Sequence, residues 1–263
     1  MTCEDSMIHS LIARIKQGYR TYPFPDKPPV LPERFCGRPR LHPNLCNQCG
    51  ACQKTCPVNA IDCVNDRIRI DLGKCLFCGD CAKACTRSAI VFTGDYRLAV
   101  NRREDLLVSD IEPKLAEAMN QQCRRIFGRS LKLRQVSAGG CNACEADTNV
   151  LTTLVFDLGR FGIQFVASPL HADGILVTGP VTQNMRYALE ETYAAVPSPK
   201  FVIAVGSCAI AGGPYSGHSE ICGGVDALIP VDLYIPGCPP HPYTILDGLI
   251  TFLGRRQPQN GKD

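Results

Sequence analysis

Cysteine is the residue type best suited to chemistry in this 263-residue sequence, which contains 17 of them. Two runs share one spacing, Cys46-x-x-Cys49-x-x-Cys52-x-x-x-Cys56 and Cys75-x-x-Cys78-x-x-Cys81-x-x-x-Cys85. Thiolates spaced in this way bind 4Fe–4S clusters, and in paired runs the fourth cysteine of each run binds the other cluster. We therefore predict two ligand sets, Cys46, Cys49, Cys52 and Cys85 for cluster I and Cys75, Cys78, Cys81 and Cys56 for cluster II.

Structural zinc is the alternative for these cysteines, because zinc also binds pairs of the CxxC type. A zinc site rarely uses a run of four cysteines with this spacing, and two copies are still less expected. The runs also end alike, in Val58-Asn59-Ala60-Ile61 and Arg87-Ser88-Ala89-Ile90, which predicts that each leads into the returning strand of a pseudo-twofold fold. The pattern favours iron–sulfur clusters.

A further group of cysteines lies later in the chain, at Cys141, Cys144, Cys208 and Cys238. Glycine precedes Cys141, Cys208 and Cys238, where it would let the backbone approach a cluster closely. Each site follows a predicted strand, and the carboxyl ends of parallel strands meet at one edge of a sheet. Spacing alone leaves two alternatives to a third cluster: ordinary buried thiols, or a thioredoxin-like redox pair at the CxxC.

Short apolar runs alternate with helical patterns after residue 129, which predicts a parallel sheet with helices on its faces. The predicted strands are Leu131–Ser137, Ile163–Ser168, Gly174–Gly179, Phe201–Gly206 and Val231–Pro236. The predicted helices cover residues 145–160, 183–195 and 242–253. Earlier in the chain we expect an amphipathic helix at 5–19, an extended proline-rich arm at 22–32 and a helical connector at 105–128.

The composition and the absence of certain sequence motifs exclude several classes of function. No stretch approaches the ~18 apolar residues of a membrane span, and the first residues lack the layout of a signal peptide, so we expect a cytoplasmic protein. A net charge of +3 with few aromatic residues argues against nucleic acid as a partner. There is no GxGxxG motif for a nicotinamide or flavin cofactor and no phosphate-binding P-loop.

Two segments resemble known families. The GGCNACE segment at 139–145, with Gly206-Ser207-Cys208 and IPGCPP at 235–240, resembles the small subunit of NiFe hydrogenases and the homologous 20 kDa-type subunit of respiratory complex I. Residues around the two cysteine runs, including FCGRPRLHP, resemble the polyferredoxin subunit of energy-converting membrane-bound hydrogenases such as formate hydrogenlyase. The chain looks like a fusion of two subunits that are usually separate. Complex I subunits of this type carry two adjacent cysteines where this chain has Cys141-x-x-Cys144, so the hydrogenase-like form is favoured.

The resemblance implies an α+β ferredoxin-like 2×4Fe–4S domain followed by an α/β flavodoxin-like domain with a parallel sheet. It implies these boundaries: an amphipathic helix and proline-rich arm at 1–35, the ferredoxin domain at 36–100, a helical connector at 101–130, the hydrogenase-like domain at 131–255 and a tail at 256–263. It also implies three 4Fe–4S clusters, the third (cluster III) on Cys141, Cys144, Cys208 and Cys238. Once these ligands are assigned, no second CxxC pair remains to hold a nickel–iron centre. Chemistry on H₂ or quinone is therefore expected mainly on another chain, and no residue of this chain is expected to be catalytic.

The resemblance further implies an electron-transfer subunit, peripheral on the cytoplasmic face of the inner membrane. The implied partners are a NiFe-hydrogenase-type large subunit, membrane-embedded subunits, and formate dehydrogenase, carbon monoxide dehydrogenase or ferredoxin as electron partner. A complex I-like quinone oxidoreductase module and a free multicluster carrier are the alternatives. Glu145 fits a helix-capping carboxylate, with a proton relay as the other interpretation. The remaining cysteines, Cys3, Cys36, Cys63, Cys123 and Cys222, are expected to be plain thiols.

Overall fold

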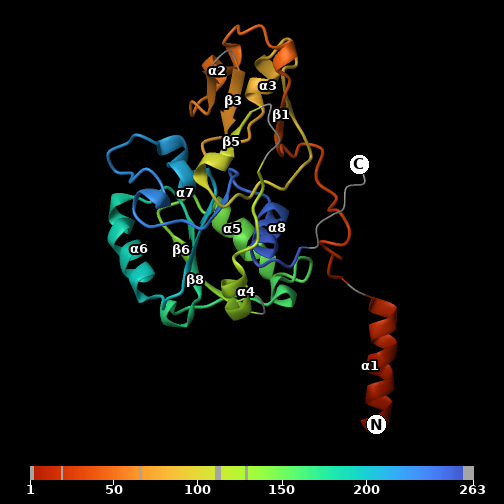
Figure 1. Ribbon diagram of the computed structural model, residues 1–263. Coiled ribbons are helices and arrows are strands. Elements are labelled where there is room, and N and C mark those ends of the chain that lie inside the picture. Colours follow the sequence, from red (N-terminus) through yellow and green to blue (C-terminus); the bar gives the residue numbers. More distant parts are fainter. Residues whose placement is uncertain (1–2, 19, 65–66, 110–113, 128–129, 257–263) are drawn as a thin grey trace.

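A five-stranded parallel sheet organises the second half of the chain (Figure 1). The computed structural model describes residues 3–18, 20–64, 67–109, 114–127 and 130–256. The strands run in the order β10-β9-β8-β6-β7, and each neighbouring pair is parallel. Their bounds are β6 Leu131–Ser137, β7 Ile163–Phe165, β8 Gly174–Thr178, β9 Phe201–Val205 and β10 Leu233–Ile235. The predicted parallel sheet is therefore confirmed.

Helices cover both faces of this sheet, as Figure 1 shows with α6 on one side and α5 and α8 on the other. The helices are α5 Ala143–Asn149, α6 Gln183–Ala195, α7 Ser207–Ala211 and α8 Pro242–Phe252. Every residue of β8 and β9 is buried, which is the pattern of a parallel strand with both faces covered. Ile175 and Val177 pack in the same apolar cluster as Leu189 of α6, whereas Leu176 packs with Leu249 of α8. Alternate residues of β8 thus pack into two apolar clusters, one on each face of the sheet.

The segment with the two cysteine runs forms small antiparallel sheets. Strand β1 Pro39–Leu41 pairs with β4 Ile90–Phe92, and β2 Ile61–Val64 pairs with β3 Arg67–Asp71, which also pairs with β5 Leu107–Val108. A short helix lies within each run, α2 Ala51–Thr55 in the first and α3 Asp80–Ala84 in the second. Ile61 and Ile90 each begin a strand, so the expected strand after each run is confirmed.

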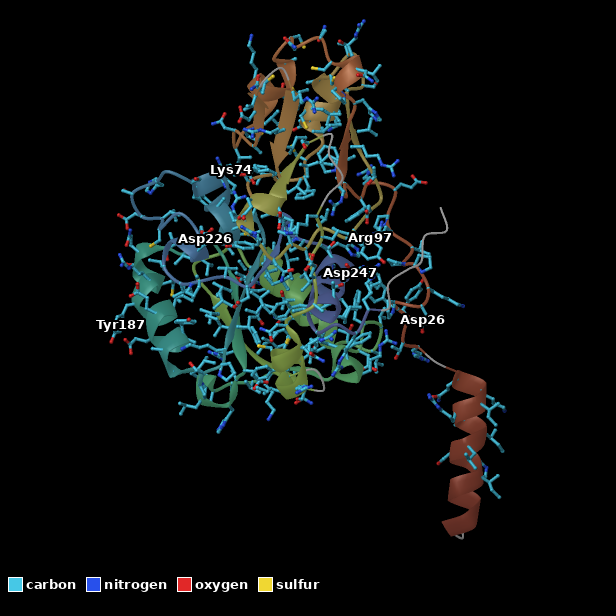
Figure 2. All side chains as sticks on the ribbon, viewed as in Figure 1. Asp26, Lys74, Arg97, Tyr187, Asp226 and Asp247 are labelled. Carbon is cyan, nitrogen blue, oxygen red and sulfur yellow. The ribbon has the colours of Figure 1, made fainter. Side chains whose placement is uncertain are left out.

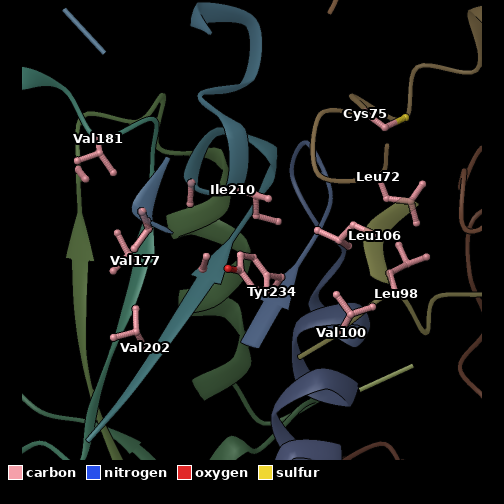
Figure 3. Packing of buried hydrophobic residues seen from close by; sticks show 14 of the residues in the cluster. Leu72, Cys75, Leu98, Val100, Leu106, Val177, Val181, Val202, Ile210 and Tyr234 are labelled. Carbon is pink, nitrogen blue, oxygen red and sulfur yellow. The ribbon is translucent and has the colours of Figure 1, made fainter. Parts of the chain in front are cut away.

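The two parts share one apolar core. Ile70, Leu72 and Cys75 belong to the same buried cluster as Val177 and Ile210, and Figure 3 shows this cluster reaching from Val177 through Ile210 to Leu72 and Cys75. An antiparallel bridge joins the parts as well, because the backbones of Val100 and Tyr234 exchange hydrogen bonds of 3.0 and 2.8 Å. This continuous packing fixes the cysteine runs relative to the sheet.

The N-terminal helix and the proline-rich arm differ in how they pack. Helix α1 spans Cys3–Gln17 and stands apart from the rest of the molecule in Figure 1. Its Leu11 and Ile15 side chains are exposed. The arm lies against the sheet-and-helix part, with Phe24 buried and its backbone carbonyl accepting a 2.8 Å hydrogen bond from Arg160. The helix predicted at 5–19 is thus confirmed, but it begins at Cys3 and ends at Gln17, and residue 19 lies outside the described residues. None of the described helices is both long and apolar enough to cross a membrane.

Two predicted helices were wrong in extent. The connector expected at 105–128 contains a 3-10 turn at Arg103–Leu106, strand β5 and a helix only at α4 Gln121–Phe127. Leu106 and Val108 are buried while Leu107 is exposed, and this period of two suits a strand rather than a helix. The helix expected at 145–160 ends with α5, after which short 3-10 turns follow at Val150–Thr152 and Leu158–Phe161. Residues 110–113 and 257–263 lie outside the described part.

Candidate iron–sulfur sites

The first group of thiols surrounds a cavity of about 200 Å³. Cys46, Cys49 and Cys52 of the first run line this cavity together with Cys85, the last cysteine of the second run. The structure therefore brings together the four residues predicted to bind cluster I. Four thiols around one hollow form a donor set that suits a 4Fe–4S cluster.

The second group has the reciprocal composition. Cys75, Cys78 and Cys81 line another cavity with Cys56, the last cysteine of the first run. The other lining residues are mostly apolar, among them Ile61, Ile70 and Phe92. This cavity therefore brings together the four thiols predicted to bind cluster II. Its apolar lining makes a charged thiolate without a metal partner energetically unfavourable.

The same local backbone geometry occurs in both runs. Gly50 and Gly79 have φ of +71° and +76°, a region that an L side chain adopts only with strain. Backbone N–H groups donate to cysteine sulfurs at matching positions: Gln48 to Cys46 at 3.3 Å and Phe77 to Cys75 at 3.3 Å. Ala60 donates to Cys56 and Ala89 to Cys85, each at 3.2 Å. Such N–H···S bonds stabilise negative charge on a cysteine sulfur, so the backbone of each run favours the thiolate form that a metal cluster binds.

Burial controls the protonation of several of these thiols. Burial raises the pKa of Cys75 to about 12 and that of Cys81 to about 11, with smaller contributions from neighbouring thiols. Both cysteines are therefore protonated at neutral pH unless a metal binds them. Iron binding would replace these protons, so the affinity of the site should depend on pH.

The third group of thiols lies at the carboxyl edge of the parallel sheet. Cys141 and Cys144 follow β6, Cys208 follows β9 and Cys238 follows β10. Burial raises the pKa of Cys144, and the nearby thiols of Cys208, Cys238 and Cys141 raise it further. The fold therefore brings these four thiols within electrostatic range of one another.

Glycine is required at the centre of this third group. Gly206 has a φ of +92°, and a Cβ added to it would lie 2.6 Å from the sulfur of Cys144. The loop before Cys208 can therefore approach Cys144 only because residue 206 has no side chain. Cys144 is buried, whereas Cys141 and Cys238 are exposed. The site is open to solvent on the side of those two residues.

Glu145 is held inside the protein next to this group. Its Oε1 accepts hydrogen bonds from the Ser137 hydroxyl at 2.6 Å and the Thr178 hydroxyl at 2.7 Å. Burial acts to raise the pKa of Glu145, but these two hydrogen bonds outweigh it and the pKa lies below its usual value. Glu145 lies in the first turn of α5, as a capping carboxylate would, and also ties that helix to the ends of β6 and β8.

One further thiol lines the cavity of the first group. Cys63 lies on the same face of the β2–β3 hairpin as Ile61 and opposite Ile68, and all three line the cavity. This position was predictable from the sequence, because alternate residues of a strand that begins at Ile61 lie on one face and Cys63 is two residues further on.

Cys36 lies near the second run, because a Cβ at Gly79 would be 3.6 Å from its sulfur. Within the described residues, no group of three or more His, Cys, Asp or Glu is placed to hold a single metal ion.

Comparison with known proteins identifies two matching families. Residues 141–252 match the family of the 20 kDa subunit of NADH ubiquinone oxidoreductase, and residues 38–86 match the 4Fe–4S dicluster domain. A membrane-bound hydrogenase subunit of Pyrococcus furiosus is 37% identical over 56% of this chain and 88% of its own length. Formate hydrogenlyase subunit 7 of Escherichia coli is 43% identical over 48% of this chain and 49% of its own length.

Two further relatives come from other complexes. An NADH-quinone oxidoreductase subunit of Heliobacterium modesticaldum is 40% identical over 46% of this chain and 69% of its own length. A chain in the solved structure of an archaeal respiratory membrane complex, the membrane-bound sulfane sulfur reductase, is 35% identical. The match covers 51% of this chain and 73% of that chain, with a TM-score of 0.45. These relatives are subunits of oxidoreductase complexes.

Proposed function

The chain belongs to the family of the 20 kDa subunit of NADH ubiquinone oxidoreductase, and from this membership we propose that it relays electrons through three 4Fe–4S clusters in a hydrogenase-type membrane complex. Bound clusters would supply one-electron carriers whose potentials span a wide range. The chain itself would hold them, exclude water from them and set their order. The observation that carries this proposal is the exchange of the fourth cysteine, which puts Cys85 in one cavity and Cys56 in the other.

We assign the ligands of clusters I and II as the spacing predicts, and those of cluster III as the family resemblance implies. Cluster I is held by Cys46, Cys49, Cys52 and Cys85, cluster II by Cys75, Cys78, Cys81 and Cys56, and cluster III by Cys141, Cys144, Cys208 and Cys238. The antiparallel pairs β1–β4 and β2–β3 support a ferredoxin-like domain at 36–100. The proposed division then continues with a connector at 101–130, a flavodoxin-like domain at 131–255 and a tail at 256–263, after an N-terminal arm at 1–35.

The order of the sites follows from packing. Cys75 of the second run shares a buried cluster with Ile210, two residues beyond Cys208 of the third group. The cavity of Cys46, Cys49 and Cys52 is lined by residues that all lie between 46 and 85, so it takes its lining from outside the parallel-sheet part. We therefore order the sites as cluster III, cluster II, cluster I. Electrons would enter or leave at the two ends of this series.

The open side of the third site would face the catalytic subunit. Cys141 and Cys238 are exposed there, and a NiFe-hydrogenase-type large subunit would cover them. The exposed apolar face of α1, with Ile8, Leu11 and Ile15, supports docking on membrane-embedded subunits at the cytoplasmic face of the inner membrane. Formate dehydrogenase, carbon monoxide dehydrogenase or ferredoxin would serve as the electron partner at cluster I.

A complex I-like role is the second candidate, in which the partner reduces quinone. The 40% identity to an NADH-quinone oxidoreductase subunit favours it. The CxxC spacing of Cys141 and Cys144 favours the hydrogenase-type role instead. A free multicluster carrier is the third candidate, and the exposed apolar face of α1 argues against it.

Metal analysis of the complex purified anaerobically from its own cells tests the proposal. We expect roughly twelve irons per chain, as three four-iron clusters require, together with nickel on a co-eluting large subunit. Quinone reduction by a nickel-free complex would identify the complex I-like role. Zinc in place of iron would refute the cluster assignment, and a lone chain of about 29 kDa on gel filtration would refute the complex.

A further inference from the structure

We propose that the hydroxyl of Ser207 forms the electronic bridge between the third site and the second, a role that rests on the electron-relay function proposed above. Its Oγ donates a 2.6 Å hydrogen bond to the backbone carbonyl of Cys75. Ser207 is 1% exposed and Cys75 is 8% exposed, so water does not enter this contact. The hydrogen bond joins two segments that are 132 residues apart in sequence.

The residues on each side of this hydrogen bond are themselves assigned ligands. Ser207 is bonded covalently to Cys208 of the third site, and the acceptor belongs to Cys75 of the second. A route from one sulfur to the other therefore runs through the bonds of three residues, Cys208, Ser207 and Cys75, and crosses a single hydrogen bond. Electron tunnelling is faster along such a bonded route than across a van der Waals gap, because coupling decays less steeply through bonds.

Ser207 also contacts the other strand end of the third site. Its backbone N–H donates to the Gly237 carbonyl at 2.8 Å, and its hydroxyl lies 3.2 Å from the same oxygen. Gly237 directly precedes Cys238. One serine therefore connects the second site to two of the four thiols of the third.

Neighbouring contacts hold both ends of the bridge in place. The carboxylate of Asp71 accepts hydrogen bonds from the Gly73 N–H at 2.9 Å and from Arg103, and the Asp71 carbonyl accepts from the Cys75 N–H at 3.0 Å. On the other side, Ile210 packs so closely on this loop that a Cβ at Gly73 would lie 2.8 Å from its Cγ2. The donor and the acceptor are thus fixed by rigid surroundings.

The ordinary interpretation is that Ser207 is only a satisfied buried hydroxyl at the start of α7, which stabilises the fold. That role does not require the acceptor to belong to a ligand of a different site. Another link between the two parts, the antiparallel bridge of Val100 with Tyr234, involves no assigned ligand. The two interpretations differ in what they predict for the rate of electron transfer.

The step in question moves one electron. With clusters bound, one electron would pass between the site held by Cys208 and the site held by Cys75, so that one would be oxidised as the other is reduced, and no bond would be broken or proton released. The hydroxyl of Ser207 keeps its proton throughout. Removing the hydroxyl should therefore change the rate of the step and leave its driving force in place.

The experiment uses the native complex with three substitutions. Ser207→Ala removes the bridge, Ser207→Thr keeps a hydroxyl at the same position, and Thr148→Val removes a matched hydroxyl. Thr148 is fully buried and donates to the carbonyl of Cys144 at 2.7 Å, but it does not reach the second site. Rapid freeze-quench EPR after a pulse of photochemical reductant follows the arrival of the electron at each cluster, and redox titration gives the midpoint potentials.

We expect a several-fold slower transfer between clusters III and II in Ser207→Ala, with unchanged potentials, and wild-type rates in Ser207→Thr and Thr148→Val. An unchanged rate in Ser207→Ala, or equal slowing in Thr148→Val, would overturn the bridge. A slower rate explained fully by a shifted potential would overturn it too. If the wild-type complex lacks the EPR signals of 4Fe–4S clusters, the proposed function itself fails, and this outcome is distinct from the others.

Discussion

Arg103 holds Asp71 through two parallel hydrogen bonds, Nη1 to Oδ1 at 2.9 Å and Nη2 to Oδ2 at 2.7 Å. The pair joins the 3-10 turn before β5 to the end of β3, after which the chain leads into the second cysteine run. The side chains are 26% and 13% exposed, so the pair is mostly shielded from water. A bidentate pair of this kind fixes geometry as well as contributing energy.

Arg103→Met should therefore destabilise the protein by about 2 kcal/mol, because the Asp71 carboxylate would lose a charged hydrogen-bond partner. Chemical denaturation followed by circular dichroism measures the free energy of unfolding. Arg102→Met is the matched control: Arg102 pairs with Glu104 at the surface, and exposed pairs contribute about 0–1 kcal/mol. Equal losses in the two variants would contradict a special role for Arg103.

In the proposed assignment, the fourth cysteine of each run binds the cluster of the other run. This predicts which cysteine substitutions affect the same cluster. Cys85→Ala should alter the EPR signal and potential of the same cluster as Cys46→Ala, although Cys85 belongs to the other run. Cys56→Ala should in turn match Cys75→Ala. Each variant is expected to lose or rearrange one cluster and to keep the other two. If Cys85→Ala behaved like Cys75→Ala, each run would bind its own cluster and the assignment would be wrong.

Cys63 offers a separate check on the same cavity. It lines the cavity of cluster I without being one of the four assigned ligands. Cys63→Ser should therefore leave the iron content unchanged, while Cys52→Ser should lower it. In the folded protein that contains iron, an alkylating reagent should modify Cys63, which is exposed, and spare Cys52. Loss of iron from Cys63→Ser would make it a ligand.

Much of this arrangement was predictable from the sequence, for physical reasons that differ between the parts. The period and apolarity of residues 131–137 and 183–195 predicted β6 and α6 with their observed bounds, since local pattern determines such elements. The exchange of Cys56 and Cys85 was predictable because fixed spacing limits how one loop can surround a cluster. That the four thiols of the third group lie at one edge of the sheet was predictable, because each follows a strand and the carboxyl ends of parallel strands share an edge.

Other features were not predictable, because they depend on contacts between distant segments. The stretch at 105–128 has an apolar pattern compatible with a helix, yet Leu107–Val108 pairs with β3 once the two parts pack together. The hydrogen bond from Ser207 to Cys75 spans 132 residues and leaves no local signal in the sequence. Glu145 was recognised as a helix-start carboxylate, but its bonds to Ser137 and Thr178 appear only in the folded sheet.

The pH dependence of stability should show the effect of Asp247. Burial raises its pKa to about 6, although Arg256 and Arg97 oppose this shift, and Figure 2 shows Arg97 and Asp247 close together. An unfolded Asp has a pKa of about 3.9, so the folded state binds more protons between about pH 4 and pH 6. Protonation of Asp247 therefore stabilises the folded state, and stability falls as pH rises through this window.

Asp247→Asn should flatten that part of the pH profile. Between about pH 5 and pH 7.5 the wild type should lose about 1 kcal/mol of stability relative to the variant. Thermal unfolding of both proteins across this range gives the difference, in which contributions from other groups cancel. A difference that stayed constant with pH, or one that changed in the opposite direction, would show that Asp247 does not titrate there.

Gly206 gives the sharpest test of the third site. A Cβ at this position would lie 2.6 Å from the Cys144 sulfur, and the backbone has a φ of +92°. Gly206→Ala should therefore displace Cys144 and abolish cluster III, which lowers the iron content from roughly twelve to roughly eight per chain. The EPR signals of clusters I and II should remain, because their ligands lie outside this loop.

Gly223→Ala is the control that separates steric conflict from backbone strain. Gly223 has a φ of +91°, nearly that of Gly206, but a Cβ there would meet nothing within 4 Å. Both substitutions place alanine at a positive φ that favours glycine, a strain of about 1 kcal/mol or more, and Gly206→Ala adds the conflict with the Cys144 sulfur, so it should lower stability more. Only Gly206→Ala should lose iron, because only its side chain occupies the space of a ligand sulfur. Full iron content in Gly206→Ala would mean that Cys144 is not held where the third site requires it.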